Sequence, residues 1–176
     1  IASVGDNLDI YDLGSGRGVC SENGNVMCDS DYDCDPWGGA YYGYCVFEET
    51  TKEVNLPFSF RFYGVDYSSV SVSSNGWISF GESELESFRN YPIPGAGGPS
   101  PMLAVFWDDL KTSNGGDVYT YADPGNEYFI VEWSNVRTQN YNSLNSFQAI
   151  LYNQSAPPYD DNEIKLQYKT FNNTSS

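Results

Sequence analysis

The sequence contains no histidine among its 176 residues. This absence excludes Ser-His-Asp triads, Cys-His nucleophiles and imidazole ligands for a metal, which removes most hydrolase mechanisms. Basic residues are also scarce: 8 Lys and Arg stand against 24 Asp and Glu, giving a net charge of −16. Such a surface repels phosphate backbones and anionic headgroups, so we expect no nucleic-acid partner. The charge is typical of a solvated exterior, and cation binding is the alternative interpretation.

Long apolar runs are missing as well. The longest, from Met102 to Trp107, is far too short to span a bilayer, so we expect no membrane insertion. No signal peptide is visible, yet the chain begins at Ile1. A processed mature chain is the simplest interpretation, and an excised fragment would look the same. We therefore expect an extracellular or cell-surface location.

Helix signals are few, and only residues 82–90 allow a short helix or a turn. The sequence is instead rich in residues that favour strands, with 15 Tyr, 10 Phe and 4 Trp. Residues 56–63 alternate, with Phe58, Phe60 and Phe62 on one side of a predicted strand.

A hairpin follows, and its register can be derived. A two-residue Asn-Gly loop would mix apolar and polar residues on each face. A three-residue turn over residues 74–76 instead pairs Val72 with Ile78 and Val70 with Phe80, which gives one buried apolar face. This register requires the glycine at the end of the turn to adopt the left-handed conformation.

Further strands are predicted beyond the hairpin. A Pro/Gly loop over residues 91–101 leads into residues 102–110, which, like residues 127–136, are apolar on both sides, as expected for central strands. Residues 164–169 alternate apolar residues with lysine and glutamine, which predicts a strand with one wet face. Seven to nine such strands favour an all-β, antiparallel two-sheet sandwich of the jelly-roll or Ig-like type.

Three segments are expected along the chain. Residues 1–16 carry a weak alternation, which predicts a single strand that either pairs within its own chain or is exchanged between subunits. Residues 17–50 form a loop-rich, cysteine-bearing insert, and residues 51–176 form the β-sandwich domain. The candidate donor residues of the first segment are Val4, Leu8 and Ile10.

The insert contains the four cysteines of the chain, Cys20, Cys28, Cys34 and Cys45. An even number in a chain expected to be secreted predicts two disulfides, with three connectivities open. Zinc is the alternative, and it is disfavoured because the spacing lacks a short CxxC pair.

Alternate aspartates run through the same insert: Asp29, Asp31, Asp33 and Asp35. Such carboxylates can converge on Ca²⁺, as they do in known calcium loops. An EF-hand is excluded because Cys34 replaces the required glycine and Ala40 the final glutamate. A looser calcium site and a solvated acidic turn remain the two interpretations. No other cofactor is expected.

Other candidate sites are weaker. Asp108 and Asp109 invite a glycosidase interpretation, but adjacent residues of a strand point to opposite faces, so a partner such as Asp160, Asp161 or Glu163 would be needed. Trp37, Tyr41, Tyr42 and Tyr44 could stack on glycans or pack the insert onto the β-domain. Asn153, Asn172 and Asn173 begin N-x-S/T triplets, which are candidate glycosylation sites and are also frequent by chance.

The order of the strand motifs carries a resemblance. The motifs are LPFSFRFYG, VSVSSNGWISFG, PMLAVFWDDL, YFIVEWSNV, FQAILY and NEIKLQY. Together they resemble a β-rich extracellular domain of large secreted bacterial surface proteins, distantly similar to the nidogen-like domain, over about residues 54–171. The resemblance implies a non-enzymatic adhesion or architectural module with no established catalytic residues. It also implies another strand or two after the NNTSS end, so that one sheet edge remains to be completed.

Two functions follow as hypotheses. The first is a structural or adhesion module, the repeating subunit of a surface fibre assembled by strand complementation through its sheet edges. The alternative is a calcium- or carbohydrate-binding accessory domain of a secreted hydrolase. An enzyme is not expected.

Overall fold

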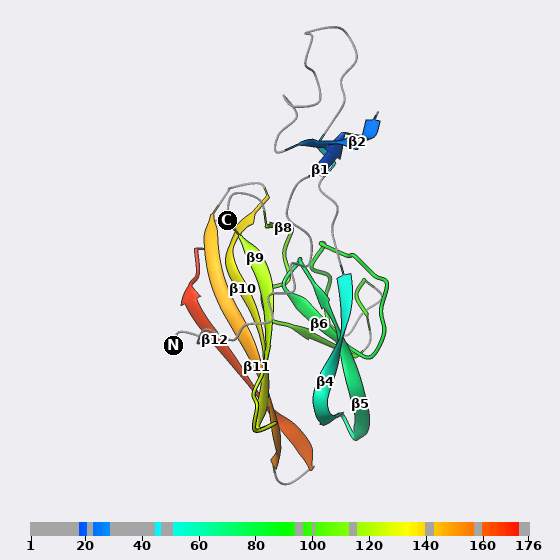
Figure 1. The fold of residues 1–176 in the computed structure, drawn as a ribbon, viewed down its shortest axis with the longest axis vertical. Helices are drawn as coiled ribbons and strands as arrows, with labels where there is room; N and C mark the ends of the chain where they lie inside the picture. The colour runs from blue at the N-terminus through cyan, green and yellow to red at the C-terminus, as the bar shows by residue number, and fades with distance from the viewer. Residues whose placement is uncertain are drawn as a thin grey trace, which may run out of the picture.

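The structure is a computed structural model. It describes residues 51–93, 97–99, 101–112, 116–139, 143–156 and 160–172, together with the backbone of residues 18–20, 23–28 and 45–46. Within these ranges there are twelve strands and no helix, and every pair of named strands is antiparallel (Figure 1). The predicted all-β, antiparallel class is thereby confirmed.

The strands are β1 (Gly18–Cys20), β2 (Asn23–Cys28), β3 (Cys45–Val46), β4 (Thr51–Phe62), β5 (Val65–Ser73), β6 (Trp77–Phe80), β7 (Met102–Ala104), β8 (Leu110–Lys111), β9 (Asp117–Ala122), β10 (Tyr128–Thr138), β11 (Leu144–Ala156) and β12 (Asp161–Thr170). They form a small sheet in the order β2-β1-β3, a four-stranded sheet in the order β4-β5-β6-β7, and a five-stranded sheet in the order β12-β11-β10-β8, in which β9 also pairs with β10.

The β5–β6 hairpin has the predicted three-residue turn. Val72 lies opposite Ile78, and Gly76 has a φ of 76°, in the left-handed region. The predicted pairing of Val70 with Phe80 is not formed, because beyond the pairing of Ser71 with Ser79 the register shifts and Val70 makes an isolated parallel bridge with Gly81. The apolar residues on the inner face of both strands enter the core, as the register argument requires.

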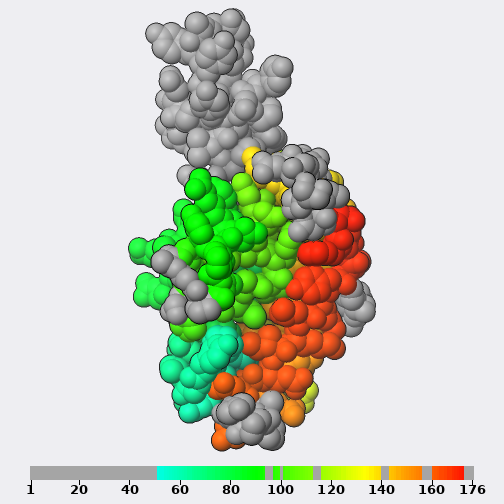
Figure 2. All heavy atoms as spheres, turned by 180° about the vertical axis from the view of Figure 1, so that it is seen from behind, coloured from blue at the N-terminus to red at the C-terminus, as the bar shows by residue number. Residues whose placement is uncertain are grey.

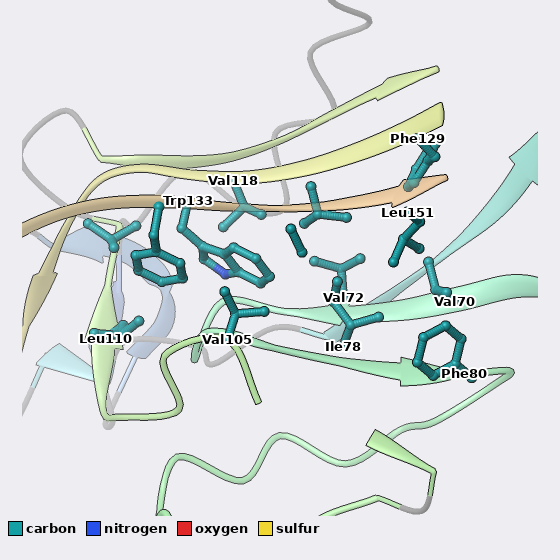
Figure 3. Close-up of a cluster of buried hydrophobic side chains, with 14 of the residues drawn as sticks. Val70, Val72, Ile78, Phe80, Val105, Leu110, Val118, Phe129, Trp133 and Leu151 are labelled. Atoms are coloured by element: carbon teal, nitrogen blue, oxygen red, sulfur yellow. The ribbon is translucent and has the colours of Figure 1, made fainter. Parts of the chain in front are cut away.

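One hydrophobic core is shared by the two larger sheets (Figure 3). Val70 and Val72 of β5 and Ile78 and Phe80 of β6 contribute from one sheet. The other sheet contributes Val118 of β9, Phe129, Val131, Trp133 and Val136 of β10, and Phe147, Ala149 and Leu151 of β11. The prediction that residues 127–136 form a central strand is confirmed, because β10 lies between β11 on one side and β8 and β9 on the other.

The prediction of a single central strand over residues 102–110 is wrong. Residues 102–104 form β7 at the edge of the four-stranded sheet, and Leu110 belongs to β8 of the other sheet. The chain crosses between the sheets here, and Val105 and Trp107 are buried in the crossing segment. Its apolar residues therefore reflect a buried crossing, which sequence periodicity does not distinguish from a buried strand.

Residues 82–90 form no helix and no turn; they are an irregular segment with one bend at Arg89, so neither predicted alternative is found. They lie across the outer face of the four-stranded sheet, where Trp77 Nε1 and Trp107 Nε1 both donate to the Ser87 carbonyl at 2.9 Å. Ser71 and Ser73 on that face are fully buried. The expectation of one buried face was therefore incomplete, because both faces of the hairpin are covered.

Candidate functional site

Strand β12 forms one edge of the five-stranded sheet. It pairs with β11 on one side, and no described strand pairs with its other side. Figure 2 shows β12 in red and orange at the surface of the molecule. An edge strand presents unpaired N–H and C=O groups at alternate residues, which is a template for another strand.

The core-facing side of β12 is apolar and incompletely covered. Leu166 lies opposite Ala149 and Tyr168 lies opposite Phe147, so both share the inner face of the sheet. Ala149 and Phe147 are buried, whereas Leu166 is 36% exposed and Tyr168 is 45% exposed. Phe171, just after the strand, is 49% exposed. We call Leu166, Tyr168 and Phe171 the edge row.

The crossing segment covers the edge row only in part. The Tyr168 hydroxyl donates to the Val105 carbonyl at 2.7 Å, and the ring of Phe171 lies edge-on to Phe106 with centroids 4.8 Å apart. Burial raises the pKa of Tyr168 above its ordinary value, so its hydroxyl stays a donor at neutral pH. These contacts fix the orientation of the edge row and leave a large part of it open.

The opposite side of β12 is polar. Lys165 and Lys169 are exposed there, and Gln167 between them accepts a hydrogen bond from Gln148 Nε2 at 2.6 Å. Two of the eight basic residues of this acidic chain thus lie on one edge strand. The prediction of one wet face is confirmed. The apolar face, however, is also partly open to water.

Side chains anchor the strand at its start. Asn162 Oδ1 accepts from the Arg61 amide at 2.7 Å, and Asp161 Oδ1 accepts from the Gly64 amide at 2.8 Å. Both bonds fasten β12 to the end of β4 in the other sheet. Tyr63, which precedes Gly64 in this turn after β4, has a φ of 49°.

Equivalent bonds hold the end of β12. The Asn172 amide donates to Asn145 Oδ1 at 2.8 Å, and Asn172 Nδ2 donates to the Leu144 carbonyl at 3.1 Å. Because both ends are held, the free edge between them is a preformed surface.

The acid pair of the crossing segment is arranged differently from the sequence expectation. Asp108 and Asp109 follow a bend rather than a strand, and Asp108 Oδ1 accepts from the Asp109 amide at 2.9 Å. Partial burial, then the neighbouring Asp108 charge, raise the pKa of Asp109 above its ordinary value. Of the proposed carboxylate partners, Asp161 is hydrogen-bonded to Gly64 at the end of β4.

The described residues contain no group of three acidic or cysteine side chains placed to hold a metal ion. The proposed calcium ligands Asp29, Asp31, Asp33 and Asp35 lie outside the described residues, as do the donor residues Val4, Leu8 and Ile10, the insert aromatics and Asn173. Their roles stay predictions.

Two of the three candidate glycosylation sites are described. Asn153 and Asn172 are both exposed, and Asn153 Nδ2 donates to the Asn126 carbonyl at 3.0 Å. Exposure is the property that a modified asparagine needs, and modification itself stays a prediction.

The backbone register of the small sheet places three of the four cysteines on strands. Cys20 of β1 lies directly opposite Cys45 of β3, and Cys28 belongs to β2. Cα atoms directly opposite in an antiparallel pair lie about 4.5 to 5.5 Å apart, which is within the range that a disulfide spans.

Among the described residues no helix is long and apolar enough to cross a membrane. A family model described as NIDO related matches residues 46–176, which is most of the chain. Dendrite extension defective protein 1 of Caenorhabditis elegans is 32% identical over 68 residues, covering 39% of this chain and 6% of that protein. The chain thus corresponds to a small part of that relative. No solved structure matches. These findings support the nidogen-like part of the resemblance and do not support an origin among bacterial surface proteins.

Proposed function

We propose, since the chain belongs to the nidogen-related family, that this domain is an extracellular, non-enzymatic structural or adhesion module that associates with copies of itself. The lack of histidine supports the non-enzymatic part, because it removes the usual general bases and nucleophile activators. The family match supports the extracellular part.

The observation that carries the proposal is the free edge of β12 with its edge row. Soluble proteins usually protect such an edge with charge, proline, a bulge or a covering segment. On β12 the charged side chains Lys165 and Lys169 lie on the outer face, and the core-facing side carries none between them. Here Leu166 and Tyr168 stay exposed on the core-facing side, although their neighbours on β11 are buried. An added strand would cover these side chains and pair the backbone groups of β12 in one step.

Association of this kind supports a fibre. Residues 1–16 of one copy and the β12 edge of the next are different surfaces, so their contact is heterologous and propagates unless a rotation closes it. We propose the domain as the repeating subunit of such a surface fibre.

We also propose that the two larger sheets form a sandwich and that the insert contains two disulfides. The shared core of the two larger sheets supports a two-sheet sandwich. The register of β1 and β3 supports a Cys20–Cys45 disulfide, which leaves Cys28 to pair with Cys34. Digestion after acidic residues separates all four cysteines, because Glu22, Asp29 and Asp35 lie between them. Mass spectrometry without reduction should then find a Cys20–Cys45 peptide pair, and a Cys20–Cys28 pair would contradict this connectivity.

The functional test alters the edge row without touching its hydrogen bond. Leu166→Lys places a charge on the surface that another copy would cover, so we expect light scattering and electron microscopy to show loss of assemblies formed by the unmodified chain. Leu85→Lys is the matched control, since Leu85 is 49% exposed on residues 82–90 away from β12. Assemblies that persist unchanged in the Leu166 variant would refute association through this edge.

A further inference from the structure

We infer that residues 4–13 of a second copy add to β12 as a strand, with Leu8 and Ile10 facing Leu166 and Tyr168 across the new pair. This inference rests on the proposed function and names the partner segment and its register. The acceptor is strand β12, which the structure describes, and the donor is inferred from the amino-acid sequence.

The β12 edge differs from the edge formed by β4. On β4, Val54, Leu56, Phe58 and Phe62 pack against the core. On β12, Ile164 packs against the core but Leu166 and Tyr168 are exposed, and the hydrogen bonds of Asp161 and Asn172 hold the strand at its two ends. Among the described strands, β12 therefore has a hydrogen-bonded neighbour on one side only.

The donor pattern matches this acceptor. In a strand, Leu8 and Ile10 point to one face and Asp9 points to the other. β12 has the same arrangement, with Leu166 and Tyr168 on one face and its lysines on the other.

The register follows from these faces. If Leu8 and Ile10 lie opposite Leu166 and Tyr168, Asp9 lies opposite Gln167, because residues directly opposite share a face. This holds for either direction of the added strand. Asp9 is then the diagonal neighbour of Lys165 and Lys169, within reach of long side chains.

Charge also favours this pairing. Two copies that each carry −16 repel one another, so contact is best made where the local charges are opposite. Residues 1–16 contain three aspartates and no basic residue. Asp9 shares the face on which β12 presents Lys165 and Lys169, whereas Asp6 and Asp12 fall on the face of Leu8 and Ile10.

Gly14 and Gly16 lie between the donor and the insert of the same copy. Glycine adopts backbone angles that other residues rarely adopt, so the donor can leave its own insert in more than one direction.

Complementation between two full-length variants tests the inference. Leu8→Asp with Ile10→Asp removes the donor, and Leu166→Lys removes the acceptor. We expect each variant alone to stay monomeric and their mixture to form a one-to-one complex, because each supplies what the other lacks. Ser3→Asp with Asn7→Asp is the control for added charge, since neither residue lies on the face of Leu8 and Ile10. This control should assemble at least as well as the unmodified chain, because the register sets position 7 opposite Lys165 or Lys169.

Charge reversal tests the register. In the mixed complex, Asp9→Lys in the donor copy should weaken binding about threefold, and Lys165→Glu with Lys169→Glu in the acceptor copy should restore it. Arg89→Glu, an exposed basic residue outside β12, should have no such effect. Failure of the lysine reversals to rescue Asp9→Lys would overturn the register.

The outcomes separate this inference from the proposed function. If the donor variant assembles normally while Leu166→Lys does not, the edge is used but residues 4–13 are not its partner. If both variants stay monomeric and no mixed complex forms, residues 4–13 do not add to the edge of a second copy, and pairing within one copy is the alternative. If both variants assemble normally, the inference and the proposed function both fail.

Discussion

The β5–β6 hairpin and strand β12 handle a similar alternating pattern in opposite ways. The hairpin is closed on both faces, with its aliphatic residues in the core and Ser71, Ser73 and Ser79 buried on the other face, where Ser83 and Pro101 bond to the serines. Strand β12 is paired on one side, and its apolar face is partly exposed.

The difference lies in side-chain size and in what crosses each face. Serines on the outer face of the hairpin let the neighbouring backbone approach, and they bond to it. Ser71 Oγ donates to the Gly81 carbonyl at 2.8 Å and accepts from the Ser83 amide at 2.9 Å. Leu166 and Tyr168 are large; the crossing segment bonds to the Tyr168 hydroxyl, and both side chains stay partly exposed. The closed region thus specifies the fold, and the open region is available to a partner.

The closed region should be broken most severely at its turn. Gly76→Ala forces a side chain into a left-handed position, where its methyl group would also overlap the backbone carbonyl of Phe106. We expect a loss of at least about 3 kcal/mol in the free energy of unfolding, measured by urea denaturation. Gly64→Ala is the matched control, because Gly64 has a φ of 75° and an added Cβ would only come within 4.0 Å of the Arg61 side chain. Its loss should be about 1 kcal/mol, and equal losses would show that the contact with Phe106 is unimportant.

The second largest loss of stability is expected at Asn75, the buried side chain of the turn. Asn75 is fully buried; its Oδ1 accepts from the Leu110 amide at 3.0 Å, and its Nδ2 donates to the Glu86 carbonyl at 3.4 Å. Asn75→Ala leaves the buried Leu110 amide without this acceptor, so we expect a loss of about 2 kcal/mol by the same measurement. The exposed Asn90→Ala should change stability by less than about 0.5 kcal/mol. A loss at Asn75 no larger than this would contradict the role of its side chain.

The crossing segment offers a test by pH. Burial and the Asp108 charge raise the folded-state pKa of Asp109, so its neutral form is favoured on folding. Its contribution is most favourable below the unfolded pKa and is lost as the pH rises through the folded pKa. Asp109→Asn should therefore raise the free energy of unfolding at pH 7 and reduce the fall in stability as the pH rises through the pKa of this carboxyl. Glu84→Gln, at an exposed site, tests whether loss of any negative charge has the same effect.

The open region should be the least sensitive. Leu166→Lys alters a side chain that is already 36% exposed, so we expect a change below about 1 kcal/mol in the stability of the monomer. Thermal unfolding of the variant at low concentration measures this directly. A larger loss would show that Leu166 belongs to the closed core, and the comparison between the two regions would then fail.

The sequence predicted the local features well. The turn over residues 74–76, the left-handed glycine and the central strand β10 follow from alternation and turn chemistry, which act over a few residues. The division of residues 102–110 between two sheets did not follow, because burial in a crossing and burial in a central strand leave the same apolar pattern.

The candidate site could be predicted in part. The apolar face of β12 was visible from Ile164, Leu166 and Tyr168, but its exposure depends on how far the opposite sheet extends. The cover on the outer face of the hairpin was missed for a related reason. Its bonds use backbone carbonyls such as that of Ser87, which carry no sequence signal.

The turn of the hairpin has a consequence for the order of folding. The Gly76 carbonyl accepts from the amides of Val105 and Phe106 at 3.1 and 2.9 Å, and the Asn75 carbonyl accepts from Asp108 at 3.3 Å. The hairpin closes over only a few residues, whereas these bonds join segments about thirty residues apart, and long loops close more slowly. We therefore expect the turn to form first and to act as the docking point that commits the chain to its crossing. Substitutions in the turn should then slow refolding, and substitutions on β12 should leave its rate unchanged.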